Sequence, residues 1–258
     1  TFLADSSGNG RKAYINNWSG TTASLTNGIF GSYFRMNINN PSSEQTYLKV
    51  TNDGTMFSDI GERIIVGGWM RPTTYSVGNT YTPLLSTRGG TGNPIFYLSL
   101  IRGKPRIMLY NSSGSLILDT SVTPSFSLEN AKWYFIAAVI EPTTQKAWKS
   151  SALTISGELN RSCTTDLIWG MLNSSYWYAG GFDDWFLDCD STLTADDLMD
   201  YFRSAVMANA GDTTGAVDGI AEPGAVTLRA SGGVYPTKGV LTTAAAECSL
   251  SGTGRDCP

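Results

Sequence analysis

The sequence predicts an all-β protein built as a two-sheet antiparallel sandwich. Glycine accounts for 28 of the 258 residues, aromatic residues for 11% and charged residues for only 16%. That composition favours short strands and tight turns over long helices. Apolar runs of about four to eight residues, bounded by Gly, Pro, Asn or Ser, repeat along the chain as they do in sandwiches. A sandwich of this length forms a single unit.

Most of the strand signal lies in the first 140 residues. The runs rich in β-branched and aromatic residues are 31–36, 46–50, 63–71, 83–86, 95–101, 105–110, 115–118 and 133–140. The connections 102–104 and 111–114 are typical of hairpin turns. Trp69 and Trp133 lie inside apolar runs, so we expect both in the core.

One short helix is predicted late in the chain. Thr194 can cap its first turn, and Asp197 three residues later can reach back. Leu198, Tyr201 and Phe202 then fall on one face, and the helix is expected to end near Ala208.

The composition changes after this helix. We therefore divide the chain into a sandwich domain, 1–210, and a C-terminal extension or arm, 211–258. The arm has two β-prone stretches, 225–229 and 239–243, but too few large apolar residues to bury a core alone. It can donate a strand to its own domain or to a neighbour, and the sequence leaves both open.

Charge and residue usage exclude several functions. The net charge of −4 and pI of about 4.9 argue against a nucleic-acid partner. The chain has no histidine, which excludes a histidine-based triad and imidazole zinc ligands. No glutamate begins a Glu-x-Asp-x-Glu pattern that would place paired carboxylates in one cleft. The longest apolar run, 133–140, is too short to span a membrane. We expect no enzyme activity.

Four cysteines, Cys163, Cys189, Cys248 and Cys257, form an even set. In a Ser/Thr/Gly-rich β chain this favours disulfides and an oxidising compartment, hence an extracellular, cell-surface or virion-surface location. Four cysteines allow three pairings. Cys248 and Cys257 would close a short loop, which would leave Cys163 with Cys189.

Four motifs resemble one family. They are Asp-Ser-Ser-Gly-Asn-Gly at 5–10, the apolar strand ending Gly-Gly-Trp-Met-Arg-Pro at 64–72, Trp-Tyr-Phe-Ile-Ala at 133–137, and Gly-Gly-Phe-Asp-Asp-Trp-Phe-Leu at 180–187 followed by 193–198. In this order they resemble LamG-like (laminin G-like) jelly rolls of the concanavalin A-like lectin/glucanase superfamily. The resemblance implies a jelly-roll sandwich. Where the family has two histidines, this sequence has Tyr134 and Phe135. Residues 1–4 alone precede the opening turn in this sequence, so we expect the sheet to lack the family's first strand.

The resemblance also implies a structural calcium ion where the opening turn meets the closing strand. Its ligands would be Asp5, Asn9, Asp183 and Asp184, since calcium prefers carboxylate and carbonyl oxygens. The alternative is that the acids of 183–200 are helix-start and solvent-facing groups.

Aromatic residues in polar loops are the candidate ligand-binding groups: Trp169, Tyr176, Trp177, Tyr178, Tyr75 and Tyr81. Flat rings on a binding face stack against sugars. The alternative is that they are core residues or cross-strand pairs.

Two functions follow from these observations. The first is a non-catalytic lectin-like domain that binds a glycan or a cell-surface ligand. The second is a structural subunit of an extracellular filament or virus particle, self-assembled through the C-terminal arm.

Overall fold

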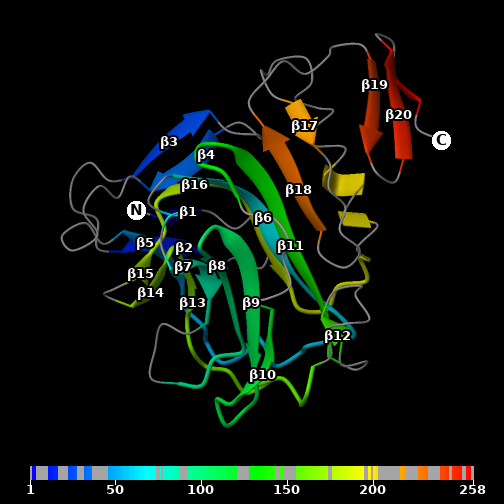
Figure 1. Cartoon of the computed structure of the whole chain (residues 1–258). Coiled ribbons are helices and arrows are strands. Elements are labelled where there is room, and N and C mark those ends of the chain that lie inside the picture. The colour runs from blue at the N-terminus through cyan, green and yellow to red at the C-terminus, as the bar shows by residue number, and fades with distance from the viewer. Residues whose placement is uncertain are drawn as a thin grey trace.

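The computed structural model describes residues 2–3, 11–16, 23–27, 32–36, 46–73, 76, 78, 80–87, 92–120, 128–142, 146–147, 155–173, 176–194, 197–198, 200–202, 216–218, 226–231, 239–243, 246–251 and 254–256. Within these residues the protein is an all-β, two-sheet antiparallel sandwich (Figure 1). The predicted fold class is confirmed.

Eight strands form the first sheet. Their order across the sheet is β1 (Phe2–Leu3), β2 (Ala13–Asn16), β5 (Tyr47–Val50), β13 (Leu167–Trp169), β7 (Thr82–Ser86), β8 (Phe96–Ile101), β9 (Lys104–Tyr110) and β10 (Leu116–Asp119). The predicted hairpin between β8 and β9 is present. Arg102 and Gly103 both have positive φ, 48° and 74°, as a two-residue hairpin turn requires.

The second sheet also has eight strands. Its order is β17 (Ala216–Asp218), β18 (Val226–Ser231), β11 (Trp133–Glu141), β6 (Ile64–Pro72), β16 (Gly180–Asp188), β4 (Ser32–Met36) and β3 (Ala23–Asn27), with β12 (Lys146–Ala147) also paired to β11. Two smaller sheets are the hairpin β14 (Met171–Asn173) and β15 (Tyr176–Trp177), and the three strands β19 (Gly239–Thr243), β20 (Ala246–Ser251) and β21 (Gly254–Asp256).

The main core lies between the two large sheets. Phe96, Leu98 and Leu100 of β8 alternate into it from the first sheet, and Ile136 and Ile140 of β11 enter from the second. This is the period of two that places every second side chain of a strand on one face. The side chains between them point to the outer faces of the two sheets.

A helical segment within 197–202 covers the outer face of the second sheet. Its start has the predicted capping box: the Thr194 backbone N–H donates to Asp197 Oδ2 (2.6 Å), and the Asp197 N–H donates to Thr194 Oγ1 (3.3 Å). Phe202 stacks on Trp69 with ring centroids 5.3 Å apart. Trp69 therefore belongs to a second, aromatic layer outside the sandwich. None of the described helical residues belongs to a helix long and apolar enough to cross a bilayer.

The C-terminal arm contains strands at both predicted stretches, β18 and β19. β18 pairs with β11 of the same chain, from Trp133 opposite Ala230 to Ala137 opposite Val226. The arm thus extends the second sheet in cis. Assembly through the arm stays a prediction.

Cys163 and Cys189 are free thiols, so the expected bond between them is not formed. Each is held by packing instead. Cys163 lies in the main core with its Sγ 3.1 Å from Thr165 Oγ1, and Cys189 packs against the same core. Burial raises the pKa of the Cys189 thiol to about 12, with a smaller contribution from Asp188. The side chain of Cys248 and all of Cys257 lie outside the described residues.

This burial predicts slow thiol chemistry. At pH 8 both native thiols should react with iodoacetamide at least about tenfold more slowly than an unfolded cysteine. Cys163 is buried away from the reagent, and the raised pKa of Cys189 lowers the population of its reactive thiolate. Peptide mass mapping of native and urea-unfolded protein measures this. Rapid native labelling of Cys189 would contradict the placement.

Candidate functional site

A row of residues crosses the outer face of the first sheet. Successive cross-strand partners are Tyr14, Lys49, Ile168, Ser86, Tyr97, Met108 and Asp119. Directly paired residues share one face of an antiparallel sheet. Leu48 and Leu98, next to two members of the row, point into the main core. The row therefore points away from the core.

The β14–β15 hairpin covers the middle of this face. Leu172 packs against Tyr97, Met108 and Tyr110. Trp177, on the other strand of the hairpin, packs with Tyr47. The hairpin buries the centre of the row, and accessible groups remain at its two ends.

Two predicted ligand-binding residues are buried in this arrangement. Trp177, on strand β15 of the hairpin, is 1% exposed, and Tyr178 is fully buried in the main core. The Tyr178 ring stacks on Phe182 at 4.3 Å, and its hydroxyl donates to the Gly181 carbonyl at 2.9 Å. Burial raises the pKa of Tyr178 well above its ordinary value. Both residues belong to the packing, which is the alternative that the sequence left open.

Trp169 is half-buried on β13, where it packs against the main core. Tyr75 lies outside the described residues. This leaves Tyr176 and Tyr81 of the predicted aromatic set.

Tyr81 and Tyr176 come together at the surface. Their rings meet edge to face with centroids 5.5 Å apart, and Tyr81 is 36% exposed. The Arg106 guanidinium carbon lies 5.9 Å from the centre of the Tyr81 ring. We call Tyr81, Tyr176, Arg106 and Asp119 the tyrosine-pair site.

Asp119 holds the guanidinium in place. Arg106 Nε and Nη2 donate to the two carboxylate oxygens of Asp119 at 2.8 and 2.5 Å. These bonds are the main cause of the raised pKa of Arg106. The fork-to-fork pair fixes both groups beside the exposed ring. Sequence reasoning missed Arg106 and Asp119. The available signal was an arginine next to Ile107 in an apolar strand, which alternation sends to the outer face.

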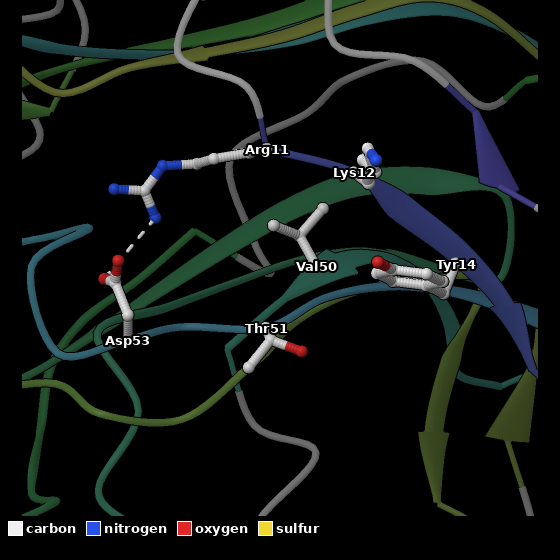
Figure 2. Close-up of a pocket in the computed structure, with 6 residues that line it drawn as sticks. All are labelled: Arg11, Lys12, Tyr14, Val50, Thr51 and Asp53. Carbon is white, nitrogen blue, oxygen red and sulfur yellow. Dashed lines mark ion pairs between the residues drawn. The ribbon is translucent and has the colours of Figure 1, made fainter.

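A pocket of about 290 Å³ lies toward the other end of the row. It is lined by Arg11, Lys12, Tyr14, Val50, Thr51 and Asp53, and we call it the Tyr14 pocket. Figure 2 shows the Arg11 guanidinium facing the Asp53 carboxylate on one side of the pocket. The Tyr14 ring lies on the opposite side. No sequence motif marks this pocket, because Tyr14 is the one aromatic residue of a four-residue strand.

The predicted calcium ligands are only partly described. Asp183 is buried on β16, while Asp184 is exposed, has a φ of 46° and accepts a hydrogen bond from the Tyr201 hydroxyl. The described parts of the chain contain no group of three or more His, Cys, Asp or Glu residues able to hold a metal ion. Asp5 and Asn9 lie outside them, so the calcium site stays a prediction.

No family model and no curated protein matches this sequence, but solved structures match the fold. The binding domain of Paraclostridial Mosquitocidal Protein 1 is 16% identical, with a TM-score of 0.56 over 83% of this chain and 51% of its own. Domain 4 of AbnA, an extracellular GH43 arabinanase from Geobacillus stearothermophilus solved with arabinotriose, is 16% identical, with a TM-score of 0.53 over 77% and 91%.

A third match is a structure of botulinum neurotoxin type C, which enters cells dependent upon interaction with two ganglioside molecules. It is 14% identical, with a TM-score of 0.56 over 84% of this chain and 50% of its own. The chain thus spans about half the length of these two toxin structures. At these identities the shared property is the β-sandwich fold.

Proposed function

We propose that this chain is a non-catalytic, lectin-like domain that binds carbohydrate at the tyrosine-pair site. The observation that carries the proposal is the exposed Tyr81–Tyr176 ring pair beside the paired Arg106 and Asp119. Ligand sites combine aromatic surface with a few fixed polar groups. Here the rings supply the apolar surface for a sugar ring, and the guanidinium and carboxylate supply a donor and an acceptor for its hydroxyls.

The charge chemistry of the site supports binding without catalysis. Hydrolysis of a glycosidic bond needs two carboxyl groups placed across it. The tyrosine-pair site has one, Asp119, and both of its oxygens already accept hydrogen bonds from Arg106.

The fold comparisons add support. Sandwiches with this fold include an arabinanase domain solved with arabinotriose and a toxin that interacts with gangliosides. We extend the proposal to the LamG-like branch of lectin sandwiches and to an extracellular or surface location. The support for that branch is the position of its motifs: Trp69 and Trp133 lie on the adjacent strands β6 and β11, and the closing motif forms β16 beside β6.

Replacing both Tyr81 and Tyr176 with alanine tests the proposal. We expect the double variant to lose at least about tenfold in affinity for any glycan that the wild type binds, roughly 1.4 kcal/mol, because the stacking surface is removed. Titration calorimetry measures the loss. Leu193→Ala, which truncates an exposed side chain elsewhere, is the matched control. A folded double variant with wild-type affinity would refute this site.

The alternative role as an assembling subunit has less to support it. β18 already occupies the edge of β11 that a neighbour's arm would need. We therefore keep carbohydrate binding as the proposed function.

A further inference from the structure

The Tyr14 pocket carries positive charge in an acidic protein. Two of its lining residues, Arg11 and Lys12, are cations, and one, Asp53, is an anion. Among the described lining residues cations outnumber anions by one, whereas the whole chain has a net charge of −4. The nearby cation Lys49 is neutralised by Asp166, with Nζ 2.9 Å from Oδ2. The cations that the described lining presents are therefore Arg11 and Lys12.

Asp53, the carboxylate among the described lining residues, is committed to its own turn. Asp53 Oδ1 accepts hydrogen bonds from the Thr55 backbone N–H (2.9 Å) and hydroxyl (2.6 Å). Arg11 Nη1 lies 3.8 Å from the same oxygen, and Arg11 Nη2 donates to Thr55 Oγ1 at 3.3 Å. Asp53 and Thr55 thus orient the guanidinium at the wall of the pocket.

The opposite wall is an aromatic platform. Tyr14 is 46% exposed, more than Tyr81, the other exposed tyrosine of the described chain. It lies on β2, between β1 and β5, so its backbone is fixed by pairing on both sides. A ring on a paired strand holds its position better than one on a loop.

We propose that the Tyr14 pocket binds a carboxylate-bearing sugar residue, such as a uronic or sialic acid. The proposal rests on the proposed function and names the ligand class of a second site. The volume, about 290 Å³, lies at the lower end of the range for small ligands, which suits one sugar unit. Arg11 and Lys12 would bind the carboxylate, Tyr14 would stack on the ring, and the Thr51 hydroxyl would meet the sugar hydroxyls.

The two sites are well separated. β2 and β10 lie near or at opposite edges of the first sheet (Figure 1). Tyr14 and Asp119 are six strand spacings apart along the row, roughly 29 Å at about 4.8 Å per spacing. A substitution in one site should therefore leave the other intact.

The test compares acidic and neutral glycans on the whole chain. The probes are 3′-sialyllactose with lactose, and trigalacturonate with galactotriose, measured by titration calorimetry at low and high salt. We expect the wild type to bind one acidic probe at least about tenfold more tightly than its neutral counterpart, and to lose this preference in high salt. Which acidic probe binds distinguishes the two sources of carboxylate.

Lys12→Gln should abolish the acidic preference, and Tyr14→Ala should weaken acidic binding. Lys132→Gln makes the same charge change at a lysine paired with Glu129 and should retain the preference. Equal binding of acidic and neutral probes, or a preference that survives Lys12→Gln, would overturn the proposal. In that case, binding of a neutral probe that is lost on replacing Tyr81 and Tyr176 would still support the tyrosine-pair site. Absence of binding to all four probes overturns the acidic-sugar assignment as well.

Discussion

Replacing Tyr178 with alanine is expected to lower the free energy of unfolding by about 3–5 kcal/mol, the cost of removing a large aromatic side chain from a core. The ring is fully buried, stacks on Phe182 and donates its hydroxyl to the Gly181 carbonyl. Truncation would leave a cavity in the main core and remove the hydrogen bond from the hydroxyl to the Gly181 carbonyl. Urea unfolding followed by tryptophan fluorescence measures the change.

The matched control is the neighbouring aromatic Tyr176. Tyr176→Ala removes a half-exposed ring and should cost no more than about 1 kcal/mol. The pair of variants separates an aromatic that holds the fold from one that faces a ligand. A Tyr178→Ala protein with wild-type stability and reduced glycan binding would reverse the two assignments.

Replacing Phe202 with alanine is expected to cost about 3–5 kcal/mol as well. Phe202 is 0% exposed, stacks on Trp69 at 5.3 Å and contacts Phe135 at 6.2 Å. Its removal would open the aromatic layer between the helical segment and the outer face of the second sheet. The loss should appear as a lower urea midpoint.

Leu193→Ala, a truncation near the same helical segment but at a 47% exposed side chain, should change stability by less than about 0.5 kcal/mol. If Phe202→Ala behaved like Leu193→Ala, the helical segment would not be part of the folded unit. Binding at the tyrosine-pair site, on the other sheet, should be unchanged in folded Phe202→Ala protein.

The strands that sequence reasoning found are those with long apolar runs. β6, β8, β9 and β11 all carry such runs because they line the main core, and each lies within two residues of its predicted bounds. The strands that it missed, such as β2 and β3, are only four and five residues long, and each ends in Asn, a residue typical of turns. Their strand character comes from pairing with neighbours that no local pattern reveals.

The candidate sites divide in the same way. Tyr81 and Tyr176 were predicted because aromatics in polar loops stand out. Arg106 and Asp119 were missed, since the β9–β10 pairing that joins them is a tertiary property. Trp177 is buried with Tyr47 and Met171 in the β14–β15 hairpin, and Tyr178 is buried because it enters the main core. Aromatic content alone does not show which rings remain exposed.

The central claim is that this chain binds carbohydrate through the tyrosine-pair site. A glycan array probed in parallel with the wild type and the Tyr81→Ala/Tyr176→Ala variant tests it most directly. The account predicts that the wild type binds at least one class of glycan on the array. The folded variant should fail to bind at least one of the glycans that the wild type binds. An array on which the wild type binds nothing, or on which the two proteins give the same pattern, would contradict it.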